Sequence, residues 1–285
     1  MSHRYYGREF TPDEIERIRQ LIAQSPDCLR AELSRRTCQL LGWVKPDGGL
    51  KDMSCRLAML AMHQDSLITL PAPRPTDFTR RLEPTRATDP EPGITQPVHQ
   101  LPAPEFHPVI KRRDSRLWNE YIERYHYLGY TPLPGAQLRY FVAIDGGFVA
   151  LLGFGAAAWK TAPRDHFIGW TPEQRQRNMH LIVNNARFLI LPWVQSKGLA
   201  SKILARIARQ LPGDWQQRYG YRPVLLETFV QTDRFRGTCY QAANWIHVGK
   251  TQGRGKLSVS TKPVLPIKDV WLYPLSRTFR RELTQ

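Results

Sequence analysis

The pattern of apolar and polar positions divides the chain into a helical beginning, an aperiodic middle and a mixed remainder. In residues 11–23 isoleucine and leucine recur every three or four positions, which is the period of an amphipathic helix. The segment begins Thr-Pro-Asp-Glu, a sequence that favours an N-cap with a capping box. Residues 29–43 and 51–64 carry two more helical patterns, and SLITLP after them predicts a short strand.

Three short helices followed by a strand within residues 1–74 predict a winged-helix-like domain that binds DNA. The third helix would be its recognition helix, with Lys51 and Arg56 near the start. The second helix adds Arg35 and Arg36 as candidates for contacts with nucleic acid. The alternative is a small helical domain for dimerisation or docking, because 11 basic residues stand against 9 acidic ones in this stretch.

Proline dominates the middle of the chain. Residues 71–108 contain ten prolines, few large apolar side chains and no periodicity. This is the composition of an extended linker. We therefore expect a Pro-rich linker over residues 75–108 that joins two separately folding domains.

Apolar runs of strand and helix type alternate after the linker, which predicts an α+β domain over residues 109–285. Asp145, Gly146 and Gly147 mark a β-hairpin between two runs rich in Val, Phe and Tyr. The other predicted elements are a helix over 115–129, a short helix from 171, strands over 184–194, 223–230 and 246–251, and helices over 201–211 and 237–245.

The charge of the chain narrows the choice of partner. The formal net charge is +16 and the isoelectric point is about 10. Residues 109–285 hold 27 basic and 11 acidic residues, so they carry the excess. An excess of this size predicts a polyanionic partner, with DNA as the first candidate.

Other features of the sequence exclude several classes of protein. No apolar run is long enough to span a membrane, and the beginning MSHRYYGREF lacks the apolar core of a signal peptide. We therefore expect a cytoplasmic protein without a membrane partner. The four cysteines show no zinc-binding spacing with each other or with histidine, so we expect no metal site.

The segment QSKGLAS follows an apolar strand and begins an amphipathic helix. It resembles the Gln/Arg-x-x-Gly-x-Gly/Ala signature of the GNAT acyltransferase superfamily. The resemblance implies a GNAT-like mixed sheet and a turn whose backbone amides hold the pyrophosphate of acetyl-CoA, since a helix N-terminus attracts anions. The residues of this candidate cofactor site are Gln195, Ser196, Lys197, Gly198, Leu199, Ala200 and Ser201.

The candidate catalytic residues lie elsewhere. Tyr240-x-x-x-Asn244-Trp245 stands where the superfamily has Tyr-x-x-x-Gly-Phe, and the resemblance implies that Tyr240 is a general acid toward the leaving thiolate. Glu227, late in a predicted strand, is the candidate general base, with an ion pair to an arginine as its alternative. His126 is a further candidate at the end of an aromatic helix, with backbone hydrogen bonding as its alternative.

Basic residues near predicted turns are candidates for contacts with nucleic acid in the second domain. The segment GKTQGRGK combines cations with glycines and can lie along a phosphodiester backbone, but it lacks the spacing of an ATP-binding P-loop. A wider basic face would add cations from a helix and from the C-terminal end. The candidates are Arg234, Arg236, Lys250, Arg254 and Lys256, and the wider face adds Lys202, Arg206, Arg209, Arg277, Arg280 and Arg281.

Several long segments are specific enough to indicate a family. They are GGLKDMSCR, HYLGYTPLPGAQLRYFV, VNNARFLILPWV and FRGTCYQAANWIHVGKTQGRGK. They resemble the DruA family of the Druantia anti-phage defence system, which also occurs beside transposases. The resemblance implies a role in defence or in a mobile element, with other subunits of such systems as partners. Two functions stay open, namely a protein that binds or processes DNA, and an acyltransferase that uses acetyl-CoA or aminoacyl-tRNA.

Overall fold

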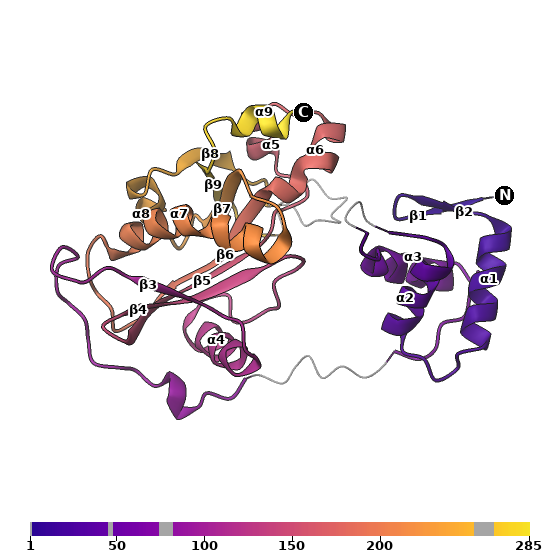
Figure 1. Cartoon of the computed structure of the whole chain (residues 1–285), viewed down its shortest axis with the longest axis horizontal. Helices are drawn as coiled ribbons and strands as arrows, with labels where there is room; N and C mark the ends of the chain where they lie inside the picture. Colours follow the sequence, from indigo (N-terminus) through magenta and orange to yellow (C-terminus); the bar gives the residue numbers. More distant parts are fainter. Residues whose placement is uncertain (1, 45–47, 74–81, 254–264) are drawn as a thin grey trace. The chain divides into compact units, whose positions relative to one another are not determined.

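The computed structural model describes residues 2–44, 48–73, 82–253 and 265–285. The chain divides into two compact units, Met1–Arg80 and Arg81–Gln285, which are described separately (Figure 1). We call them the N-terminal and the C-terminal unit.

The N-terminal unit consists of a hairpin and three helices. Its elements are β1 (His3–Tyr5), β2 (Arg8–Phe10), α1 (Pro12–Ala23), α2 (Arg30–Leu40) and α3 (Asp52–Gln64). The predicted capping box of α1 is confirmed, because the Thr11 side chain accepts from the Glu14 amide while the Glu14 side chain accepts from the Thr11 amide. The winged-helix assignment stays a prediction, since this arrangement alone does not identify a wing or a recognition helix.

The strand predicted for SLITLP is wrong, since residues 66–71 have no strand conformation. Ile68 and Leu70 are nonetheless buried in the core of this unit. Their segment bonds back to the preceding helix instead of to a strand, because the Leu67 amide donates to the Met62 carbonyl at 2.8 Å. Apolar side chains here mark a buried irregular segment, which periodicity cannot separate from a strand.

The C-terminal unit contains the α+β domain. Its elements are the short 3-10 turns η1 (Arg86–Thr88) and η2 (Met179–Leu181), the strands β3 (Glu105–Pro108), β4 (Leu138–Ile144), β5 (Gly147–Ala156), β6 (Ile182–Ile190), β7 (Leu225–Gln231), β8 (Ile246–Lys250) and β9 (Lys268–Pro274), and the helices α4 (Arg112–Tyr125), α5 (Ala162–Ile168), α6 (Pro172–Asn178), α7 (Leu199–Tyr219), α8 (Thr238–Ala242) and α9 (Phe279–Leu283).

The strands form one mixed sheet, as the sequence predicts. Within the described residues it has seven strands in the order β3-β4-β5-β6-β7-β9-β8. The pair β6 and β7 is parallel, whereas the other neighbouring pairs are antiparallel. The predicted hairpin between β4 and β5 is confirmed, and Asp145 and Gly146 both have a positive φ at its turn. The sequence analysis missed β9, although this strand lies between β7 and β8.

Helices cover both faces of the sheet (Figure 1). Neighbouring residues of β4 point to opposite faces, as in any strand. Phe141 packs against Tyr121 of α4, with 6.4 Å between ring centroids. The Tyr140 hydroxyl donates to Asp214 of α7 at 2.9 Å. The main core of the unit therefore fills the space between the sheet and the helices on each side.

The prediction of a free linker over residues 75–108 does not hold for residues 82–108, which belong to the C-terminal unit. The Tyr125 hydroxyl donates to the Thr88 carbonyl at 2.7 Å, and Arg124 pairs with Asp89 at 2.8 Å. Residues 105–108 form the edge strand β3. Proline-rich chain carries no periodic pattern, but its carbonyls still accept hydrogen bonds from a neighbouring surface, and sequence patterns do not reveal that surface.

Candidate functional site

The candidate site lies where the neighbouring strands β6 and β7 diverge. The strands β6 and β7 pair only from Ile182 to Asn184 on one side and from Leu225 to Glu227 on the other. Opposite β5, strand β6 contains one extra residue, because Gly153 faces Arg187 while Phe154 faces Asn185. A bulge of this kind bends a strand and turns its side chains in a new direction. Beyond the bulge, β6 and β7 separate and leave a space between them.

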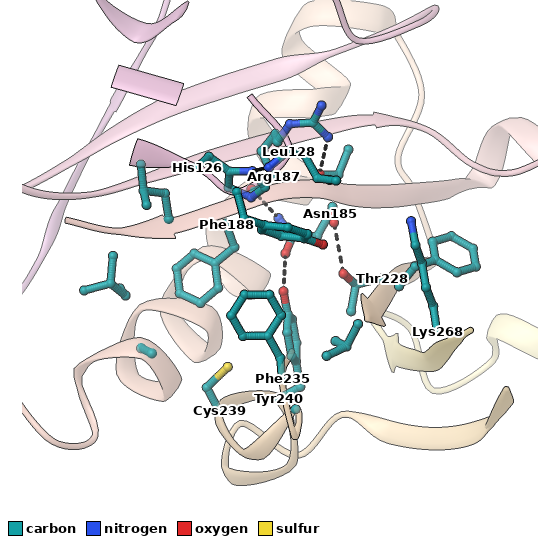
Figure 2. Close-up of a pocket in the computed structure, with 18 of the residues that line it drawn as sticks. His126, Leu128, Asn185, Arg187, Phe188, Thr228, Phe235, Cys239, Tyr240 and Lys268 are labelled. Atoms are coloured by element: carbon teal, nitrogen blue, oxygen red, sulfur yellow. Dashed lines mark hydrogen bonds between the residues drawn. The ribbon is translucent and has the colours of Figure 1, made fainter. Parts of the chain in front are cut away.

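Side chains replace the hydrogen bonds that the separated strands cannot make. The Thr228 hydroxyl of β7 donates to the backbone carbonyl of Asn185 at 3.0 Å. The Asn185 amide donates to the Arg187 carbonyl at 3.1 Å, and its oxygen accepts from the Tyr240 hydroxyl at 3.0 Å. Asn185 is 3% exposed, so this network fixes the inner wall of the space (Figure 2).

The space is a cavity of about 570 Å³, which lies within the range of roughly 300–1,000 Å³ that small-molecule sites occupy. Figure 2 shows Tyr240, Phe235 and Cys239 on one side of it, Arg187 and His126 on the other, and Lys268 at a third. The walls are residues 125–128 at the end of α4, 184–190 of β6, 228–230 of β7 and 235–240 around α8, with Ala200 and Lys268.

The walls of the cavity hold cations but no carboxylate. Arg187, Arg236 and Lys268 line it, and among the described wall residues there is no Asp or Glu. Arg187 donates to the Ala186 carbonyl and to the Thr131 hydroxyl, which are neutral groups. In the part of the chain that the structure describes, none of the three cations has an ion-pair partner. Burial lowers the pKa of Arg187 and of Lys268, and the Arg187 charge lowers that of Lys268 further.

His126 lies in the wall of the cavity, as a catalytic or ligand-binding histidine would. Burial, together with the charge of Arg187, lowers its pKa to about 4, so the ring is neutral at pH 7. Its Nδ1 accepts from the Leu128 amide at 3.2 Å, which places the proton of the neutral ring on Nε2. His126 is therefore a hydrogen-bond donor, and the backbone hydrogen bond proposed as its alternative role is also present.

Tyr240 is buried in the cavity wall, in the middle of α8. Burial raises the pKa of its hydroxyl, which therefore stays protonated at neutral pH. Asn244, which stands where the GNAT superfamily has glycine, has φ +61°. Asparagine adopts this left-handed conformation more readily than most residues. The departure from the family pattern therefore preserves the local backbone.

Glu227 does not reach the cavity. It is fully buried, and its Oε2 lies 2.7 Å from Arg164 Nη1 while its Oε1 accepts from the Ala158 amide at 2.7 Å. Burial raises the pKa of the carboxyl, and Arg164 opposes that shift. The ion pair that the sequence analysis gave as the alternative to a general base is what the structure contains. Glu227 is 0% exposed and does not line the cavity, so a substrate in the cavity has no direct contact with its carboxylate.

The turn at residues 195–201 is partly covered by the chain itself. Gly198 has φ +86° and caps α7, as the signature requires. The Gln195 amide donates to the Ile94 carbonyl at 2.8 Å, and Lys202 Nζ donates to the Val98 carbonyl at 3.1 Å. Residues 94–101 thus lie against the predicted pyrophosphate site. From the seven candidate cofactor residues, only Ala200 lines the cavity.

The basic residues predicted to contact nucleic acid have different surroundings. In the C-terminal unit, Arg236 lines the cavity and Arg234 lies 5.2 Å from the Tyr127 ring. Lys250 is 2.7 Å from Asp269, so its charge is paired. Arg254 and Lys256 lie outside the described residues.

In the N-terminal unit, Arg35 and Arg36 both pair with Glu32, at 2.6 and 3.3 Å. Lys51 is the N-cap of α3 and Arg56 is half-buried. The charges of Arg35 and Arg36 are therefore paired within the N-terminal unit.

The wider basic face is spread over separate places. Arg206 and Arg209 lie beside residues 104–106 in a groove away from the cavity. Arg280 packs over the Phe167 ring at 4.4 Å near the C-terminal end. Among the described residues, no group of three or more His, Cys, Asp or Glu side chains could hold a metal ion, and none of the described helices has the length and hydropathy of a membrane span.

Sequence reasoning missed Asn185, Arg187 and Lys268, which shape and charge the cavity. Asn185 lies at the beginning of the strand predicted over residues 184–194. Arg187 interrupts an apolar strand, and a charged residue inside such a run is a signal that could have been used. Lys268 was missed together with β9, whose run of strand-forming residues VWLY, bounded by Pro274, was available in the sequence.

The family described as Druantia protein DruA matches residues 64–268. No curated protein sequence matches the chain.

Several solved structures similar to the chain are acetyltransferases. Aminoglycoside acetyltransferase AAC(6')-Ib in complex with coenzyme A has 14% identity, covers 62% of this chain and 98% of its own, and gives a TM-score of 0.42. The ribosomal-protein-S18-alanine N-acetyltransferase from Escherichia coli has 11% identity, covers 61% and 94%, and gives 0.38. An N-acetyltransferase from Staphylococcus aureus Mu50 has 13% identity, covers 61% and 99%, and gives 0.38.

The resemblance to the GNAT superfamily rests on the turn at residues 195–201, on Tyr240 and on the mixed sheet with its parallel pair β6 and β7.

Proposed function

Because the chain belongs to the DruA family, we propose that it is a DNA-binding protein of an anti-phage defence system or a mobile element. Its GNAT-like C-terminal unit binds the polymer. The sugar-phosphate backbone lies over the mouth of the cavity between β6 and β7. Any processing of DNA strands takes place at this same cavity.

One observation carries this proposal, namely the set of cations without carboxylate partners in the cavity walls. Arg187, Arg236 and Lys268 have no ion-pair partner among the described residues. Lys268 is half-buried, and a partly desolvated charge without a counter-ion is unfavourable. Phosphate groups provide that counter-charge. The net charge of +16 supports the same class of partner.

The experiment is a titration of fluorescently labelled DNA with the full-length protein, measured by anisotropy at low salt. Lys268→Gln should weaken binding about 10-fold or more, because one charged hydrogen bond contributes roughly 1.5 kcal/mol or more. Lys160→Gln removes an exposed lysine outside the cavity and should leave the affinity unchanged. Equal affinity of the two variants would contradict the proposed binding site.

Acyl transfer is the second candidate function. Ala200, in the first turn of α7, and Tyr240 line the same cavity, so a cofactor phosphate at the turn and a general acid would be neighbours. The described residues that line the cavity include no carboxylate that could act as a general base, and residues 94–101 lie against the turn. Calorimetry with acetyl-CoA separates the candidates, because an acyltransferase should give saturable heat and a DNA-binding protein without this activity should give none.

A further inference from the structure

An exposed aromatic side chain lies at the rim of the charged cavity. Phe235 lines the cavity and is 46% exposed, although large apolar side chains are normally covered. It meets the Tyr127 ring edge to face, with 5.0 Å between centroids. Arg234 lies 5.2 Å from that same Tyr127 ring. Phe235 is thus held in place by its neighbours while a large part of its surface is available to a ligand.

Two neutral polar side chains line the cavity together with the cations. His126 presents a donor at Nε2, and the Tyr240 hydroxyl donates to Asn185 at 3.0 Å. Arg187 lies on the same side of the cavity as His126, and Lys268 lies on a third side (Figure 2). The cavity therefore combines an aromatic surface, two half-buried cations and a hydrogen-bond donor within one small volume. A nucleotide has a flat base, a charged phosphate and base edges that accept hydrogen bonds.

The size of the cavity limits what can enter it. At about 570 Å³ it accommodates a ligand of nucleotide size and excludes a double helix. A nucleotide inside a duplex reaches such a pocket only after it leaves the base stack, at a cost of a few kcal/mol. A single strand, or a duplex with one unpaired nucleotide, avoids most of that cost.

We infer that the cavity takes one unpaired nucleotide of a DNA strand, whose base stacks on Phe235 and whose phosphate lies against Lys268 and Arg187. This inference rests on the proposed DNA binding and adds a preference for an unpaired nucleotide. His126 Nε2 donates to an acceptor on the base. Aromatic stacking of this kind tolerates any base, so the preference is for structure and not for sequence.

The test compares two labelled duplexes of equal length with the full-length protein, one fully paired and one with a single unpaired nucleotide. The wild type should bind the second about 10-fold or more tightly. Phe235→Ala should weaken binding of that duplex by about 5- to 150-fold, the range expected for loss of one base–aromatic stack, and should leave binding of the paired duplex unchanged.

Trp159→Ala is the matched control, because Trp159 is 51% exposed and does not line the cavity. It should retain the preference for the unpaired nucleotide. Phe235→Leu keeps an apolar side chain without a stacking ring and should behave as Phe235→Ala does. If the wild type binds both duplexes equally, or if Phe235→Ala weakens both equally, the inference is wrong while DNA binding stands. If neither duplex binds, the proposed function itself fails.

Discussion

At the scale of single residues, the environment of a side chain decides which of its possible roles it can have. Glu227 and His126 were both catalytic candidates. Glu227 has its two oxygens bound by Arg164 and by the Ala158 amide, so it stabilises the fold. His126 lies in the cavity wall, where it is neutral and offers a donor. The residue type and its place in a strand or helix were visible in the sequence, but these partners were not.

The buried state of His126 makes folding depend on pH. Its pKa falls from 6.5 to about 4 on folding, so the unfolded chain binds a proton that the folded chain does not. The stability that neutral His126 contributes is complete above about pH 6.5 and is lost as the pH falls toward 4. Between pH 7.5 and 4.5 this amounts to about 2 to 3 kcal/mol.

Urea unfolding of the wild type and of His126→Gln at these two pH values measures that effect. The free energy of unfolding of the wild type should fall by about 2 to 3 kcal/mol more than that of the variant. The glutamine side chain of the variant does not titrate, so other groups contribute equally to both proteins. An identical fall in the two proteins would show that His126 is not held neutral.

At the scale of elements, the turn before α7 is built around a glycine that cannot be replaced without strain. Gly198 has φ +86°, and a Cβ added there would lie 3.2 Å from Val98 Cγ1. Residues 94–101 hold this position because Lys202 donates to the carbonyls of Val98 and Leu101 at 3.1 and 3.3 Å. The turn, the helix and the covering segment therefore form one packed arrangement.

Gly198→Ala should lower the free energy of unfolding by about 1 to 3 kcal/mol, since an L-residue is strained at this φ and Val98 must move. The matched variant is Gly213→Ala, in the same helix. A Cβ at Gly213 meets nothing within 4 Å, and alanine there should raise the free energy of unfolding by about 0.5 to 1 kcal/mol. Thermal unfolding of both variants measures the difference. A stable Gly198→Ala protein would mean that the turn is not packed as described.

The sequence predicted the elements that have strong periodicity or clear turn chemistry. The capping box of α1 and the hairpin around Asp145 both formed as expected, because local interactions determine them. It did not predict that residues 94–101 cover the turn before α7, since that contact joins positions about a hundred residues apart. It also missed the bulge in β6, because a bulge depends on the pairing with β5. The cavity follows from that bulge, so its walls could be only partly foreseen.

At the scale of the whole chain, the basic residues of 109–285 do not gather on the one basic face that the sequence predicts. Arg187, Arg236 and Lys268 lie together around the cavity, and none of them has an ion-pair partner among the described residues. Counting charges along the sequence predicted a polyanionic partner but could not show which cations are already paired. Lys250, for example, is bound to Asp269.

The salt dependence of DNA binding tests the central claim, that the cavity cations contact phosphates, most directly. The measurement is the slope of log K against log salt concentration for the full-length protein. In the triple variant Arg187→Gln/Arg236→Gln/Lys268→Gln this slope should become shallower by about 2 to 3 units, because each lost phosphate contact removes about 0.7 to 0.9 from the slope. The matched variant, Arg206→Gln/Arg209→Gln/Arg281→Gln, removes three exposed cations outside the cavity and should keep the wild-type slope. If both variants show the same slope, the cavity cations do not contact the DNA backbone and the account is wrong.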